Sequence, residues 1–147
     1  MREKFVKGIR RIYAVLVCMA VCLCAFVSNV SALQALSGER TFYLYNASSQ
    51  AVMKNQLTLA DVFALQGESV CITLPKDIDG EGYARGIAKA LDIEIIFTET
   101  IGETISFYGF SPRFLTSIQL YGKAVNAHLV VGNGVLIVGT PIVFGGY

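Results

Sequence analysis

The sequence predicts an α+β domain, in which an antiparallel β-sheet carries one main helix packed on a face, after an N-terminal signal or anchor segment. Three observations lead to this fold class. Residues Ser69–Leu74 alternate between polar and apolar side chains, as a half-buried strand does. Residues 77–92 carry apolar side chains at helical spacing. From Ile93 onward, short strand-like runs alternate with turns, so a strand, a helix and several hairpins follow one another.

The length and composition allow one domain. The chain has 147 residues, of which 54% are apolar and 16% charged, with a formal net charge of +1. This balance excludes disordered, collagen-like and low-complexity proteins, and the length excludes a multidomain enzyme.

The N-terminus has the pattern of an export signal. Five basic residues precede an uncharged apolar run, Ile12–Val27, which is long enough to enter a bilayer but short for a full span. Val30 and Ala32 then place small side chains at the spacing that signal peptidase favours. Two interpretations stay open: a signal cleaved after Ala32, or a retained membrane anchor. The basic residues are Arg2, Lys4, Lys7, Arg10 and Arg11.

Both interpretations place the protein outside the cytoplasm, either secreted or anchored in the membrane by an uncleaved signal. The expected organisation is therefore a signal peptide or anchor over 1–32, a short tether over 33–40 and one α+β domain over 41–147.

The cysteines exclude a disulfide scaffold. Cys18, Cys22 and Cys24 fall inside the apolar run, which leaves Cys71 alone in the mature chain. Cys24 is not expected to be lipidated, because Ala20–Leu23 lacks the usual leucine followed by small residues.

The mature chain is acidic. From Leu33 onward seven basic residues stand against ten acidic ones, a net charge of −3, and the basic residues are not clustered. Since binding of nucleic acid needs clustered cations that displace counterions from phosphates, no nucleic-acid partner is expected.

The first half of the domain contains two expected strands. Thr41–Val52 opens with aromatic residues and is expected to form a strand, whereas Asn55–Ala64 suits a short helix or a loop. In Ser69–Leu74, the apolar side chains Val70, Ile72 and Leu74 share one face of the strand.

The helix expected over 77–92 is the best-defined element. Asp77 or Asp79 can cap its N-terminus. Glycines at positions 82 and 86 weaken it by about 1 kcal/mol each relative to alanine, so its stability must come from docking on a sheet. The apolar stripe that docks consists of Ala84, Ile87, Ala88 and Leu91.

The C-terminal part is expected to consist of strands and turns. Gly132–Asn133–Gly134 supplies the positive backbone dihedrals of a tight hairpin. The expected strands lie within Ile93–Thr98, Ile105–Tyr108, Ser117–Tyr121, Val125–Val131, Val135–Val138 and Ile142–Phe144.

The chain ends with a strand that runs into Val138–Val143 (VGTPIV), after a helix, a hairpin over Ile93–Phe110 and the strand Val125–Leu129. This order and this ending resemble the YwmB-like exported proteins of spore-forming Gram-positive bacteria, over about Ser69–Tyr147. The resemblance implies a TATA-box-binding-protein-like fold, a signal peptide and a connection to sporulation or the cell envelope. It carries over no catalytic residue. The fold label suggests DNA, which the acidic mature chain argues against.

Cys71 and His128 are the candidate residues for catalysis. A cysteine nucleophile needs a base, and His128 is the only histidine in the chain. The alternative hypothesis is accordingly a small extracytoplasmic enzyme that uses Cys71 and His128. The favoured interpretation is structural, with Cys71 filling a sheet face and His128 at a polar or exposed sheet position, so we predict no catalytic site.

No metal or cofactor is expected. Asp77–Gly82 resembles the start of a calcium loop, but the position that needs a bidentate glutamate is Ala88, and capping of the helix explains the acids better. A structural zinc site needs four ligands, more than one cysteine and one histidine supply.

The main hypothesis is an exported, non-enzymatic domain that acts through contacts with a protein or a cell-envelope partner, with membrane contact through the N-terminal segment if it is uncleaved. A third possibility is a structural subunit that pairs through an exposed strand edge. Ten aromatic residues are expected to be mostly core, and any exposed cluster of them would indicate a partner surface. These are Phe42, Tyr43, Tyr45, Phe107, Tyr108, Phe110, Phe114, Tyr121, Phe144 and Tyr147.

Overall fold

The computed structural model describes residues 10–22, 31–45 and 51–144. The chain divides into two compact units, Met1–Ser31 and Ala32–Tyr147. In the first unit, residues 10–22 are helical with exposed side chains. Within the described residues, no helix has both the length and the apolarity that crossing a bilayer requires. The rest of the expected signal, residues 1–9 and 23–30, lies outside the described residues.

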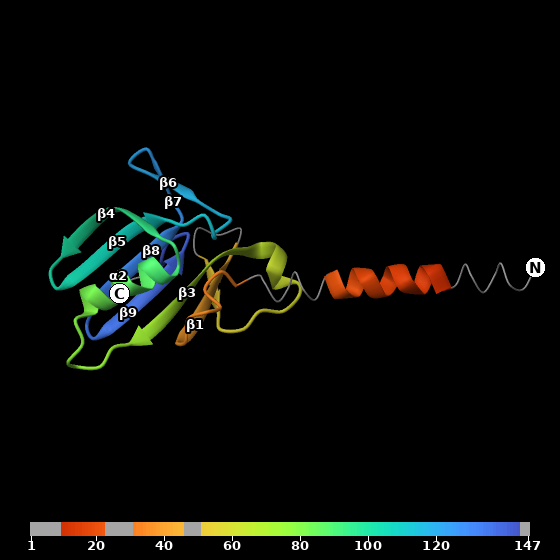
Figure 1. Ribbon diagram of the computed structural model, residues 1–147, viewed down its shortest axis with the longest axis horizontal. Coiled ribbons are helices and arrows are strands. Elements are labelled where there is room, and N and C mark those ends of the chain that lie inside the picture. The colour runs from red at the N-terminus through yellow and green to blue at the C-terminus, as the bar shows by residue number, and fades with distance from the viewer. Residues whose placement is uncertain (1–9, 23–30, 46–50, 145–147) are drawn as a thin grey trace, which may run out of the picture. The chain divides into compact units, whose positions relative to one another are not determined.

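The second unit is built on a seven-stranded antiparallel sheet with the order β2-β1-β3-β9-β8-β5-β4 (Figure 1). A separate two-stranded sheet pairs β6 with β7. The strands are β1 (Glu39–Leu44), β2 (Val52–Lys54), β3 (Leu65–Thr73), β4 (Glu94–Ile101), β5 (Thr104–Phe110), β6 (Ile118–Leu120), β7 (Lys123–Val125), β8 (Ala127–Gly132) and β9 (Val135–Thr140).

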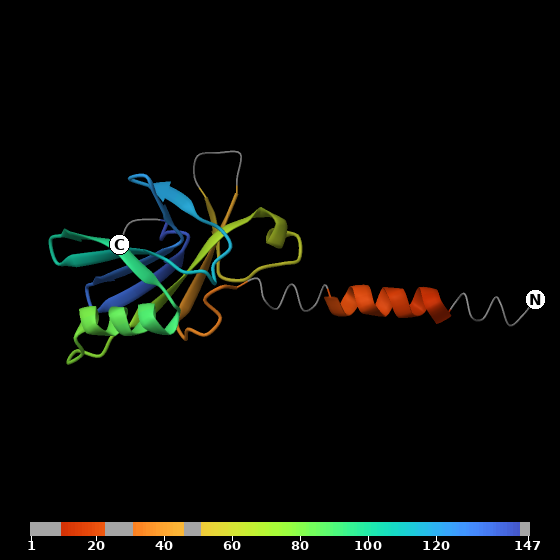
Figure 2. The same ribbon diagram turned by 45° about the horizontal axis from the view of Figure 1, so that its top comes forward.

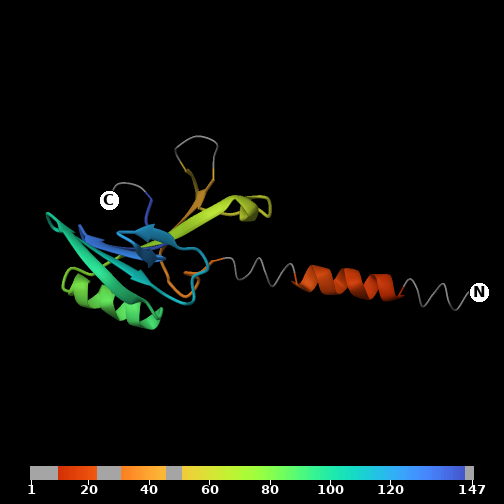
Figure 3. The same ribbon diagram turned by 90° about the horizontal axis from the view of Figure 1, so that it is seen from above.

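One α-helix, α2 (Gly80–Ala90), covers a face of this sheet and packs against β8, β4 and β9 (Figures 2 and 3). Of the two aspartates predicted to cap the N-terminus of this helix, Asp79 is the one that does so, because its Oδ1 accepts from the Glu81 backbone N–H at 3.1 Å. Ala84 and Ala88 are buried on the sheet side, as predicted. The predicted α+β class with a large antiparallel sheet is confirmed.

The core lies between α2 and the sheet. The predicted alternation in β3 is confirmed, since Val70 is fully buried there and Ile72 and Leu74 pack against the same cluster. The other fully or almost fully buried side chains of this cluster are Leu33, Ala84, Phe107, Ala127, Leu129, Leu136 and Val138.

The predicted hairpin turn at Gly132–Asn133–Gly134 is also confirmed. Asn133 and Gly134 have φ values of +52° and +75° between β8 and β9. Positive φ at both central residues matches the right-handed twist of the paired strands, and glycine adopts it without steric cost.

The N-terminal part of the domain differs from the expectation. Leu33, expected in a tether over 33–40, is fully buried in the core, and β1 begins at Glu39. The segment expected as one strand, Thr41–Val52, forms parts of two paired strands, with Leu44 opposite Val52.

Two further differences affect the C-terminal half. The strand expected over Val125–Val131 is interrupted at Asn126, whose side chain binds the loop after β5 while its backbone N–H donates to the Gly109 carbonyl at 3.0 Å. Residues 142–144, expected as a strand, fold back over the sheet after Pro141. The missing side chain of Gly139 allows this, because a Cβ there would lie 3.0 Å from the Val143 backbone nitrogen.

Candidate interaction surface

A lobe formed by residues 51–64, here called the β2–η1 lobe, begins with the edge strand β2 and ends in the 3-10 helix η1 (Asp61–Ala64). Figures 1 to 3 show η1 at the end of the domain away from α2. The backbone N–H of Tyr45, just after β1, donates to the Ala64 carbonyl at 2.7 Å, which ties the end of η1 to the main sheet.

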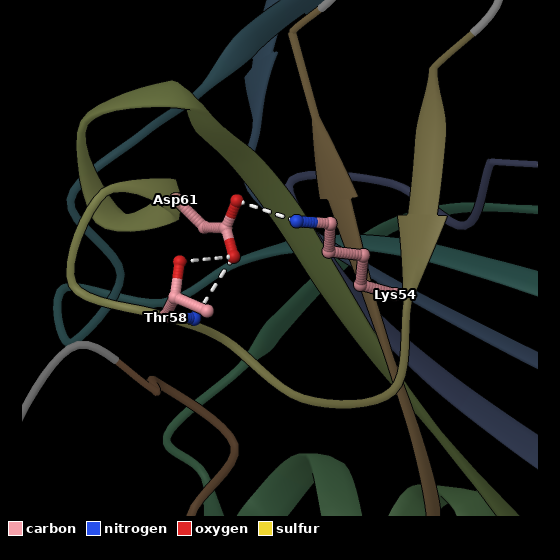
Figure 4. Close-up of polar contacts among 3 residues, drawn as sticks. All are labelled: Lys54, Thr58 and Asp61. Carbon is pink, nitrogen blue, oxygen red and sulfur yellow. Dashed lines mark hydrogen bonds and ion pairs between the residues drawn. The ribbon is translucent and has the colours of Figure 1, made fainter.

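An ion pair holds the loop of this lobe in place (Figure 4). Lys54 Nζ lies 2.7 Å from Asp61 Oδ1, while Asp61 Oδ2 accepts from the Thr58 backbone N–H at 2.9 Å and from the Thr58 hydroxyl at 2.7 Å. The hydrogen bond from Lys54, followed by those from Thr58, lowers the pKa of Asp61 to about 2. The carboxylate is therefore ionised at neutral pH and occupied by its own loop.

The same lobe exposes large apolar side chains to water. Phe63 is 89% exposed, and η1 contributes no buried residue. A four-residue 3-10 helix and a three-residue edge strand have too little surface to bury every apolar side chain they carry. The large apolar side chains exposed along this lobe and just before it, here together called the apolar cluster, are Tyr45, Val52, Met53, Leu59 and Phe63; Val52 and Met53, successive residues of β2, point to opposite faces of the strand.

This surface suits binding better than chemistry. Its carboxylate is committed to Lys54 and Thr58, and the apolar side chains provide contact area without reactive groups. Sequence reasoning singled out only Tyr45 of the cluster. The available signal was the run Leu57–Phe63, which carries more apolar residues than one short turn can bury.

The structure places Cys71 and His128 far apart. Cys71 in β3 lies opposite Ile137, and His128 in β8 lies opposite Gly139, both partners belonging to the intervening strand β9. Two strand spacings and two residues of offset put their Cα atoms about 12 Å apart. A direct hydrogen bond between a thiol nucleophile and its base is out of reach at this separation.

His128 is buried. Of the two positions expected for it, a polar or an exposed site on the sheet, the exposed site is therefore wrong. His128 is only 2% exposed, its ring stacks on Tyr108 at 4.2 Å, and its Nδ1 accepts from the Val143 backbone N–H at 3.2 Å. Burial lowers the pKa of His128 to about 4. The ring is therefore neutral at pH 7, with its proton assigned to Nε2 because Nδ1 is an acceptor.

The stack continues across the sheet as a row of aromatic rings. Phe97 stacks on Tyr108 at 4.5 Å, and Tyr121 meets Phe97 edge-on at 5.5 Å. Near the other edge, Tyr43 contacts Phe144 at 5.1 Å. Tyr108 and His128 lie on the face of the sheet opposite α2, since they alternate with Phe107 and Leu129, which are buried in the core beneath the helix.

The aromatic residues singled out in the sequence divide between core and surface. Phe42, Tyr43, Phe107 and Phe114 are buried. The exposed ones are Tyr45, Phe110 and Tyr121, while Tyr108 and Phe144 are half-buried and Tyr147 lies outside the described residues.

In the described part of the chain, no three His, Cys, Asp or Glu side chains gather as a metal site would require. Comparisons of the chain with protein-family models, with curated proteins and with solved structures give no match. The resemblance to YwmB-like proteins stays a prediction.

Proposed function

We propose that this chain is exported across the cytoplasmic membrane and acts there as a non-enzymatic binding domain for a protein or cell-envelope partner. The N-terminal basic and apolar pattern supports export, and the acidic mature chain argues against a nucleic-acid ligand. The resemblance to YwmB-like proteins adds a connection with the cell envelope or sporulation.

The observation that carries the proposal is the apolar cluster of the β2–η1 lobe. Full burial of a side chain such as that of Phe63 or Leu59 contributes about 1.5–3 kcal/mol, a gain that this fold leaves unused. The ion pair between Lys54 and Asp61 fixes the loop that carries Leu59 and Phe63, which lowers the entropy cost of binding.

Capture of partners by the tagged full chain from the membrane fraction of sporulating and vegetative cells tests the proposal. Phe63→Ser should abolish capture of a specific partner. Ile101→Ser is the matched control, because Ile101 is also exposed but ends β4 beside the β4–β5 turn, at the opposite end of the domain (Figure 1). Equal capture by both variants would contradict the role of the cluster.

The enzymatic alternative requires Cys71 and His128 to act together, and the register of β3, β9 and β8 gives it no support. Turnover of a cell-envelope fragment that is lost in Cys71→Ala or His128→Ala would nevertheless overturn the non-enzymatic proposal.

A further inference from the structure

Glu68 is a buried acid in the middle of the sheet. It lies in β3, is 2% exposed, and its Oε1 accepts from the Leu33 backbone N–H at 2.8 Å. A buried carboxylate is costly unless it is hydrogen-bonded or paired with a cation. Glu68 thus binds a main-chain nitrogen that lies 35 residues earlier in the sequence.

Leu33 is held at three points. Its side chain is fully buried in the core, its N–H binds Glu68, and its carbonyl accepts from Arg40 Nη2 at 3.1 Å. Ala32, the preceding residue, is exposed. Ala32 is the first residue of the domain's compact unit, and the Ala32–Leu33 bond is the one that the spacing of Val30 and Ala32 marks for signal peptidase.

We propose that Glu68 receives the α-ammonium of Leu33 after signal peptidase cleaves the Ala32–Leu33 bond, so that processing adds a buried ion pair to the mature domain. In this step water adds across the peptide bond, Ala32 keeps the carboxylate, and the released amine of Leu33 takes up a proton. This inference rests on the proposed function, because only an exported chain is processed in this way.

The ion pair replaces a weaker contact that already has suitable geometry. A hydrogen bond between a charged donor and a charged acceptor is about twice as strong as one between neutral groups. Arg40 is the other cation beside Leu33, but its guanidinium is directed at the carbonyls of Leu33 and Leu36, whereas the nitrogen of Leu33 faces Glu68. Ala84 and Ala88 of α2 lie in the same core cluster as Leu33, and both are apolar, so they bring no charge to this part of the core.

Two forms of the mature chain, one beginning at Leu33 and one beginning at Ala32, test the inference. Both retain every core side chain, but the extra residue moves the ammonium by about one Cα–Cα step of 3.8 Å. The form that begins at Leu33 should have an equilibrium constant for folding about tenfold larger. Urea unfolding, with each form released from a fusion by a site-specific protease, measures the ratio.

Glu68→Gln should remove the difference between the two forms, since it removes the negative charge while keeping a hydrogen-bonding side chain. Glu39→Gln, at an exposed acid of the neighbouring strand, should leave the difference intact. If the Glu68→Gln variant does not fold, the difference in stability between the two forms that retain Glu68 still tests the inference. Equal stability of these forms overturns the inference.

N-terminal sequencing of the protein from exporting cells separates failure of this inference from failure of the proposed function. A mature chain that begins at Leu33 supports both. An exported chain that begins elsewhere, or retains its leader, overturns this inference and leaves the proposed function standing. An unprocessed chain that is soluble in the cytoplasm overturns both.

Discussion

His128 links the stability of the domain to pH. Its pKa is lowered from 6.5 to about 4 by burial, so the unfolded chain takes up a proton before the folded one does. The contribution of neutral, buried His128 to the stability of the fold is complete above pH 6.5 and is lost as the pH falls to about 4. The free energy of unfolding should fall by about 3 kcal/mol over this range, at 1.36 kcal/mol for each unit of pKa difference.

His128→Asn is the matched variant for urea unfolding as a function of pH. The asparagine Oδ1 can replace Nδ1 as the acceptor for the Val143 N–H but does not titrate in this range. Its unfolding free energy should change much less between pH 6.5 and 4. An unchanged slope in the variant would show that another group titrates.

Asn126 holds the loop after β5 through three hydrogen bonds. Its Oδ1 accepts from the Ser111 N–H at 2.7 Å, and its Nδ2 donates to the carbonyls of Ser111 and Phe114 at 2.7 and 3.1 Å. Asn126→Ala leaves buried partners unsatisfied, which should cost about 3 kcal/mol. Urea unfolding measures this loss, and Asn55→Ala, at an exposed position, should change stability by less than about 0.5 kcal/mol.

At the scale of elements, the order of the β2–η1 lobe should depend on the charge of Asp61. The pKa of Asp61 is lowered from 3.8 to about 2 by its bonds to Lys54 and Thr58, so its stabilisation is complete above pH 4 and lost as the pH falls to 2. The protection of the Thr58 amide against exchange, taken relative to the intrinsic exchange rate at each pH, should fall over that range, because this N–H donates to the carboxylate.

Asp61→Asn is the control for this titration. The variant should show faster exchange at Thr58 at neutral pH and no further titration below pH 4. Salt should weaken the effect in the native chain, because the pair between Lys54 and Asp61 is exposed enough to be screened. Exchange in β8 and β9 should not follow this titration.

The elements that could be predicted are those whose pattern is local. Asp79, the apolar stripe of α2 and the turn at Asn133–Gly134 each act within a few residues, so spacing and turn chemistry were sufficient to find them. The apolar cluster could not be found in this way. Whether Leu59 and Phe63 are covered depends on how much sheet lies beside η1, which periodicity does not show.

At the scale of the whole molecule, residues 33–40 show that composition alone does not predict which segments belong to the core. A short segment between an apolar run and the first aromatic strand has the composition of a tether. Its role is set instead by Glu68, which lies 35 residues later in the chain, and by Arg40 at the end of the segment itself; both hold Leu33 against the core. The long-range contact with Glu68 leaves no periodic signal around Leu33.

Leu33→Ala should therefore destabilise the whole domain. Removal of a fully buried leucine side chain leaves a cavity between α2 and the sheet, and substitutions of this kind cost about 2–5 kcal/mol. Urea unfolding of the mature chain should show a lower midpoint with an unchanged slope. Leu115→Ala, at a fully exposed leucine, should leave the midpoint within error. If Leu33→Ala matched this control, residues 33–40 would be a tether after all, and the domain would begin at β1.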